Sequence, residues 1–246
     1  MTENIKDAIE YGVELARGQE VIHLVNDKNF VDITKGRLEE LEPIKYAKTL
    51  NVGTLTSLVK FLKEKFDEKE PAPLLIHVES PTKVSVKSQL NLDRKRESII
   101  EASAELDNYP FGRFMDSEKF IINILSLFQR DENSELVRRV ASSIRIEGGG
   151  DLQDDGVSQI VTAKVGAATT EKAEVPSPVD LRPYRTFLEV EQPVSPFIFR
   201  INKDGFCALF DADGGMWRYH AIQNILEYLE SSLSEEIEEG YISIIA

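Results

Sequence analysis

The chain has 246 residues, with 29 Lys and Arg against 43 Asp and Glu, so its formal charge is −14. A composition of 41% hydrophobic and 29% charged residues is typical of a globular protein with a real core and excludes disorder over the whole chain. The single Cys excludes an intrachain disulfide and a Cys-based zinc cluster, and the acidic charge disfavours general binding to duplex DNA.

The first third of the sequence is predicted to alternate between helices and strands. An apolar stripe at helical spacing predicts a helix over residues 3–17, and two short apolar runs predict strands at 21–25 and 30–33. A second amphipathic helix is predicted over residues 54–66, with Thr54 as its N-cap. Because the start of the chain lacks a basic and apolar leader and no long apolar run follows, we expect neither a signal peptide nor a membrane span.

The middle of the chain continues the mixed pattern. Residues 74–78 and 83–90 flank a Ser-Pro-Thr turn and predict a β-hairpin, which a strand over 98–106 follows. An amphipathic helix is predicted over residues 117–129, and a shorter helix is predicted to begin with Ser134 as its cap.

An acidic, Gly-rich stretch at residues 147–156 marks the clearest shift in composition. Such a stretch is typical of a loop rather than of a phosphate-binding turn, because no apolar helix follows the glycines. We therefore expect one α+β domain over residues 1–246, with this loop as the best candidate point of subdivision.

Beyond this loop the sequence becomes rich in strand patterns. Strands are predicted at residues 158–165 and 179–190, then a hairpin formed by 197–201 and 206–210, and finally a helix over 218–233. The expected fold class is therefore α+β, with a mixed N-terminal half and an antiparallel, β-rich C-terminal half closed by a helix.

The chain ends in an apolar, strand-like tail after an acidic run. Its candidate contact residues are Tyr241, Ile242, Ile244 and Ile245. An apolar tail is unfavourable in water, so it either completes the sheet of its own chain or adds a strand to the sheet of another molecule. The second alternative predicts a homo-oligomer.

The sequence contains no motif that by itself identifies a reaction. Three carboxylates, Asp180, Glu189 and Glu191, could bind a divalent ion in a metal-dependent nuclease, but the lysine that such a site requires is absent from the matching position. The three His are isolated in sequence, and we interpret His23, His77 and Cys207 as structural residues. We therefore expect no catalytic residues, no metal and no cofactor.

Basic residues gather in one part of this acidic chain, at Lys83, Lys87, Arg94, Lys95 and Arg96. A strip of this kind could bind the phosphates of a nucleic acid. Solvated strand and turn positions explain the same residues without any ligand.

One segment resembles a known family. The motif consists of Arg182, Tyr184, Arg185, Phe187, Glu189, Glu191, Gln192 and Pro193, and an aromatic-rich strand follows it. This stretch resembles the YfdQ-like phage and prophage proteins, a domain of unknown function. The resemblance implies a phage or prophage origin and expression in the bacterial host cytoplasm, with no established activity. From the residues themselves, we expect Tyr184 and Phe187 to anchor the core and Arg185 to pair with Glu189.

Two functional hypotheses follow. The first is a non-enzymatic phage accessory protein that acts by self-assembly, including a large closed assembly, or by binding a host or phage protein. An acidic inhibitor of a host defence system is a narrower version of this hypothesis. The second is a nucleic-acid-handling protein of phage replication or recombination that uses the basic strip.

Overall fold

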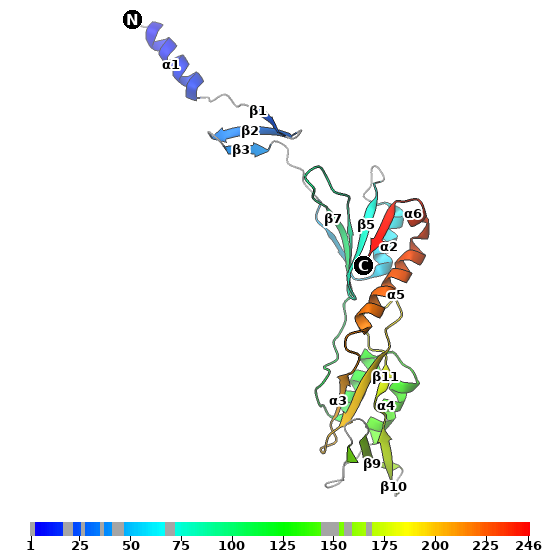
Figure 1. Ribbon diagram of the computed structural model, residues 1–246. Coiled ribbons are helices and arrows are strands. Elements are labelled where there is room, and N and C mark those ends of the chain that lie inside the picture. The colour runs from blue at the N-terminus through cyan, green and yellow to red at the C-terminus, as the bar shows by residue number, and fades with distance from the viewer. Residues whose placement is uncertain are drawn as a thin grey trace. The chain divides into compact units, whose positions relative to one another are not determined.

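The chain folds into two compact units, Met1–Ala47 and Lys48–Ala246, here called the N-terminal unit and the main unit. Helices combine with mixed sheets in the computed structural model, which confirms the α+β prediction (Figure 1). The residues that the structure describes are 3–16, 22–25, 28–34, 37–40, 47–66, 72–143, 153–154, 159–165 and 169–246. Within this described part, no helix has both the length and the apolar character that crossing a membrane requires.

The N-terminal unit contains one helix and one small sheet. Helix α1 spans Glu3–Ala16, and strands β1 (Ile22–Val25), β2 (Lys28–Thr34) and β3 (Arg37–Glu40) form an antiparallel sheet in that order. The helix and the first two strands confirm the sequence prediction, whereas β3 was not predicted. Its short, charged sequence, Arg-Leu-Glu-Glu, lacks a clear strand pattern.

The main unit is built first around a five-stranded sheet of order β14-β5-β6-β7-β4. Its strands are β4 (Leu50–Val52), β5 (Leu74–Ser80), β6 (Lys83–Lys87), β7 (Ser98–Ser103) and β14 (Ile242–Ile245). The three central strands are antiparallel, while both outer strands run parallel to their neighbours. The predicted hairpin is therefore confirmed as β5 and β6.

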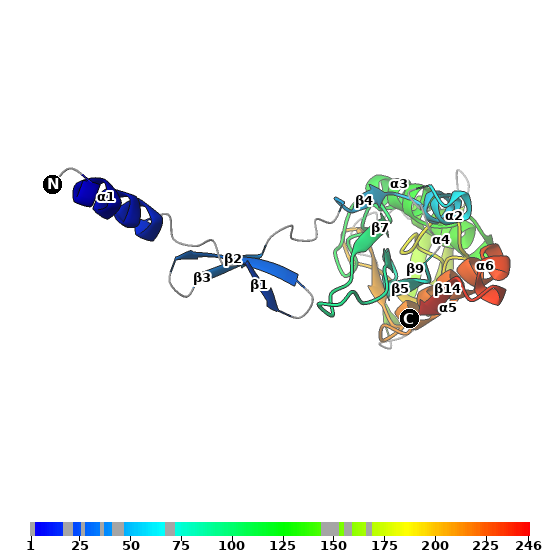
Figure 2. The ribbon, with the colours of Figure 1, turned by 90° about the horizontal axis from the view of Figure 1, so that it is seen from above.

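Helices cover one face of this sheet. Helix α2 (Leu55–Glu64) starts at Thr54, whose side chain accepts a hydrogen bond from the Ser57 N–H, as predicted from the sequence. Its leucines pack with apolar side chains of α5 (Trp217–Ser232) and of the sheet in a first hydrophobic core. The short helix α6 (Ser234–Glu238) then leads into β14, which lies beside β5 (Figure 1, Figure 2).

A second hydrophobic core lies under a three-stranded antiparallel sheet of order β11-β12-β13. Its elements are α3 (Ser117–Leu127), α4 (Glu132–Ser143), β11 (Val179–Leu181), β12 (Ser195–Ile201) and β13 (Cys207–Asp211). Aromatic rings dominate its packing, and those of Phe120 and Phe199 stack with centroids 5.2 Å apart. Helix α5 contributes to the first core rather than to this one.

A further small sheet consists of β8 (Gln153–Asp154), β9 (Gln159–Val165) and β10 (Thr169–Val175). Strand β9 was predicted and β10 was not. Most of the Gly-rich stretch 147–156 lies outside the described residues, so a subdivision at this point stays a prediction. The boundary between the two compact units lies elsewhere, between Ala47 and Lys48.

Two local predictions are wrong. The strand expected over 179–190 ends at Leu181, because Pro183 lacks a backbone N–H and the following residues form an irregular loop. Helix α4 begins at Glu132 rather than after Ser134. Asp131 and Ser134 cap it reciprocally, since each side chain accepts a hydrogen bond from the backbone N–H of the other.

Candidate functional site

The C-terminal tail forms strand β14 and completes the sheet of its own chain. Ile242 to Ile245 pair in parallel with Leu74 to His77 of β5, and the Leu74 N–H donates to the Tyr241 carbonyl oxygen. Tyr241 and Ile242 are buried in the first core, so neither side chain is exposed to a partner molecule. Of the two sequence alternatives, the structure therefore has the intramolecular one, while Ile245 remains exposed at the sheet edge.

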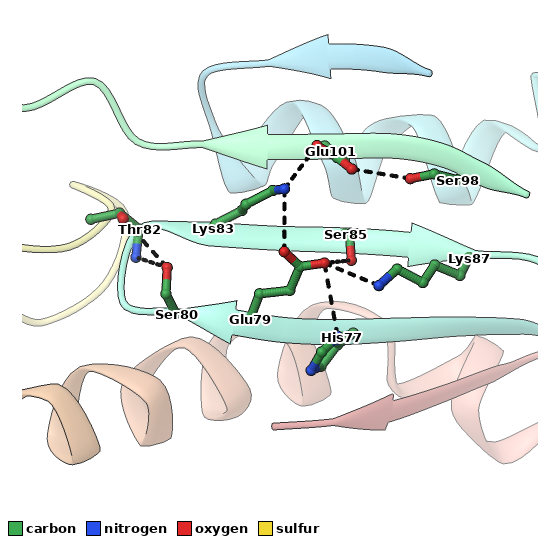
Figure 3. Close-up of polar contacts among 9 residues, drawn as sticks. All are labelled: His77, Glu79, Ser80, Thr82, Lys83, Ser85, Lys87, Ser98 and Glu101. Atoms are coloured by element: carbon green, nitrogen blue, oxygen red, sulfur yellow. Dashed lines mark hydrogen bonds and ion pairs between the residues drawn. The ribbon is translucent and has the colours of Figure 1, made fainter. Parts of the chain in front are cut away.

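Two lysines of the predicted basic strip belong to a network of charges on the face of the five-stranded sheet opposite the first hydrophobic core (Figure 3). Lys83 Nζ lies 3.2 Å from Glu79 Oε2 and 3.1 Å from Glu101 Oε2, and Lys87 Nζ lies 3.0 Å from Glu79 Oε1. The Ser85 hydroxyl donates to Glu79 Oε1 over 2.7 Å. Two cations thus meet two carboxylates, which neutralises this part of the strip.

The remaining residues of the strip lie in a turn after β6. Arg94 has φ +59°, and Arg96 Nη1 donates to the Ser88 carbonyl oxygen. Both side chains are exposed, as is that of Lys95. The structure therefore does not present the five basic residues as one uncompensated surface.

The Glu79 network also explains a strong shift in acidity. The hydrogen bond from Ser85 lowers the pKa of Glu79 most, Lys87 and Lys83 lower it further, and burial opposes them, so that the pKa is about 2. The contacts of Lys83 with Glu101, and to a smaller extent with Glu79, raise the pKa of Lys83. Glu79 thus remains ionised in acid well below the usual range of a carboxyl group.

We expect the free energy of unfolding of Glu79→Gln to change less with pH at acid pH than that of the wild type. Because the pKa of Glu79 is lower in the folded state than in the unfolded state, its ionised form stabilises the folded state at pH values above the unfolded pKa. This contribution is lost as the pH falls from about 4.5 to about 2. The partly exposed position limits the contribution to about 2 kcal/mol. Urea unfolding over that pH range measures it. Glu105→Gln removes the same charge from an exposed site as the control, and parallel profiles of wild type and Glu79→Gln would contradict the prediction.

The three carboxylates considered for a metal site are engaged in different contacts. Glu189 Oε1 accepts a hydrogen bond from the Thr56 N–H at the start of α2, whereas Glu191 Oε1 lies 3.2 Å from Arg182 Nη1. Asp180 is exposed on β11. In the part of the chain that the structure describes, no group of three or more His, Cys, Asp or Glu is placed to hold a metal ion.

Cys207 lies inside the second core and is fully buried. Burial raises the pKa of its thiol to about 12, with a smaller contribution from the Asp116 charge. Since the thiolate is the reactive form, this environment suits the structural role that the sequence indicated.

The family motif forms a loop that a single buried side chain organises. Gln192 Oε1 accepts hydrogen bonds from the backbone N–H groups of Arg185 and Thr186, and Gln192 Nε2 donates to the carbonyl oxygens of Phe187 and Val190. Phe187 points into the first core, as predicted. Tyr184 is only partly buried, and its N–H donates to the Leu127 carbonyl oxygen.

Arg185 is the most unusual residue of the motif. It pairs with Asp211 at 2.9 Å rather than with Glu189, because the loop directs it toward the end of β13. Its Cζ also lies 4.6, 5.1 and 4.9 Å from the ring centroids of Phe111, Phe197 and Trp217. Burial lowers the pKa of Arg185, and the Asp211 charge opposes this effect.

Arg185 and its partner Asp211 line a cleft of about 460 Å³, here called the Arg185 cleft. Its walls include Asp107, Tyr184, Arg185, Asp211, Trp217 and Arg218. The volume lies within the range of small-molecule sites, about 300–1,000 Å³. Sequence reasoning identified Arg185 and Tyr184 but missed the other walls, which come from the segment before α3, from β13 and from the start of α5.

The N-terminal unit carries a second candidate surface. Ile5 and Ile9 of α1 are 61% and 60% exposed, and Val13, one further turn along, is 46% exposed. The spacing of four residues places these side chains on one side of the helix. The sequence analysis used this apolar stripe to predict the helix, and in the structure all three side chains are exposed.

Comparisons with protein-family models, with curated proteins and with solved structures gave no match to this chain.

Proposed function

We propose that this protein is a non-enzymatic phage or prophage accessory protein that acts in the bacterial cytoplasm by self-assembly through helix α1. The resemblance of residues 181–193 to the YfdQ-like proteins supports the phage origin. The observation that carries the assembly is the exposed apolar stripe of α1. A large closed assembly is one form that such contacts can produce.

The helix itself needs a partner surface. It has 14 residues, and isolated helices shorter than about 12–15 residues are only marginally stable in water. Burying a fully exposed Ile side chain contributes about 1.5–3 kcal/mol. Packing α1 against the same helix of a second copy would bury Ile5 and Ile9 and stabilise the helix in the same step.

Charge distinguishes a second copy from a different protein. Acidic residues outnumber Lys6 in α1, so two copies of the helix repel each other electrostatically. Added salt screens that repulsion and is expected to strengthen self-association. Binding to a basic partner protein would instead weaken with salt, which makes the salt dependence a direct test between the two forms of the hypothesis.

The double substitution Ile5→Asp and Ile9→Asp is expected to weaken self-association roughly hundredfold, which is about 3 kcal/mol. Light scattering of the purified full chain over a range of concentrations measures the change. Ile122→Asp, at a 56% exposed position of α3, is the matched control and should leave the mass unchanged. A wild-type chain that stays monomeric at every concentration, or a double variant that keeps the wild-type mass, would overturn the proposal.

A further inference from the structure

The Arg185 cleft contains a buried cation that its protein contacts do not fully satisfy. The Arg185 side chain is only 10% exposed, and Asp211 contacts its Nη2 atom. Its Nη1 atom is buried and has no hydrogen-bond partner among the described residues. Buried donors are nearly always paired, so the unpaired Nη1 of a residue that lines the cleft favours an acceptor close to it. The Tyr109 hydroxyl, from another wall residue, is buried and unpartnered in the same way.

A second cation is held at the cleft without an acidic partner. Arg218 is exposed, forms no ion pair among the described residues, and places its Cζ 4.8 Å from the Trp217 ring centroid. Gly215 makes room for it, because a Cβ at that position would lie 2.7 Å from Arg218 Nη1. With φ +89°, Gly215 also has a backbone conformation that other residues rarely adopt.

The charges of the walls select the ligand. Asp107 and Asp211 balance Arg185 and Arg218, so a doubly charged phosphate would meet two carboxylates while gaining two cations. A singly charged carboxylate fits better, because it accepts hydrogen bonds from guanidinium groups in a planar, two-pronged geometry. The rings of Tyr184 and Trp217 add flat apolar surface beside these cations.

We propose that the Arg185 cleft is a binding site for a small aromatic carboxylate. The carboxylate group contacts Arg218 and supplies the acceptor that Arg185 Nη1 lacks, and the aromatic ring lies against Trp217. The residues of this site belong to the main unit and share none with the α1 stripe, so ligand binding and self-assembly can be tested with different variants.

The chain offers its own reporter, because Trp217 is its only Trp. Benzoate titrated into the full-length protein is expected to change the Trp217 fluorescence saturably. Acetate, which lacks the ring, and benzamide, which lacks the charge, are expected to bind at least about tenfold more weakly. Phenyl phosphate is expected to bind more weakly than benzoate because of its second negative charge.

Two variants test the residues. Arg218→Ala removes an exposed side chain and is expected to weaken benzoate binding about tenfold or more, whereas Arg113→Ala, an exposed arginine outside the cleft, is expected to have no effect. Saturation-transfer NMR of the ligand provides a readout that does not depend on the fluorescence of a changed Trp217 environment. Absence of saturable benzoate binding, equal binding of benzamide, tighter binding of phenyl phosphate, or equal effects of the two variants would each overturn the proposal.

Discussion

Deletion of residues 241–246 is expected to lower the free energy of unfolding of the main unit by about 4 kcal/mol and to leave self-association intact. The deletion removes two buried side chains of the first core, Tyr241 and Ile242, and exposes apolar surface of β5. It also removes the parallel pairing of β14 with β5 and the contact of Lys65 Nζ over the Tyr241 ring. Urea unfolding followed by circular dichroism, together with light scattering, measures both effects.

The matched control is Ile245→Ser, which changes an exposed edge residue of the same strand. Surface substitutions of this kind usually alter stability by less than about 0.5 kcal/mol. A deletion variant that keeps its unfolding midpoint but loses its wild-type mass would contradict this assignment. That result would mean that the tail pairs with the sheet of another molecule and that α1 is not the main assembly element.

Elements whose signals are local were predictable from the sequence. The cap at Thr54 and the leucines that follow it specify α2, and the alternating residues around Pro81 specify the β5–β6 hairpin. The hairpin of β12 and β13 was also predicted, and Gly205 in its turn adopts φ +80°. In each case the residues that decide the structure lie within a few positions of one another.

The place of the tail required information that no local pattern holds. Its apolar residues predict a strand, but the partner strand β5 lies far away in the sequence and pairs with it in parallel. The prediction of a strand through the motif around Arg185 was wrong for a related reason. Alternation of aromatic and charged residues resembles a strand, whereas the buried amide of Gln192 holds the same residues in a loop.

The candidate cleft was less predictable still. Its charged walls come from segments that are separated by up to about half the chain, and the partner of Arg185 depends on where β13 ends. A buried unpaired nitrogen is a property of the packed structure and has no counterpart in sequence spacing. The one signal in the sequence was the number of aromatic and charged residues in the motif, which is high for a loop between two strands.

Gln192→Ala is expected to destabilise the main unit by about 3 kcal/mol, because it leaves four backbone groups of the motif loop without their partners in a buried environment. The lost contacts are to the N–H groups of Arg185 and Thr186 and to the carbonyl oxygens of Phe187 and Val190. Loosening this loop would also free Arg185 from its position over Phe111. Chemical unfolding monitored through Trp217 fluorescence measures the loss.

Gln192→Met separates hydrogen bonding from packing, because methionine has a similar length but can replace none of the four contacts. It is expected to lose nearly as much stability as Gln192→Ala. Asn224→Ala is the control, since Asn224 makes one hydrogen bond to the same loop, to the Glu191 carbonyl oxygen, and its loss should cost about 1 kcal/mol. If the methionine variant were as stable as wild type, packing rather than the buried amide would hold the loop. The position of Arg185 in the cleft would then depend on Asp211 and the surrounding rings alone.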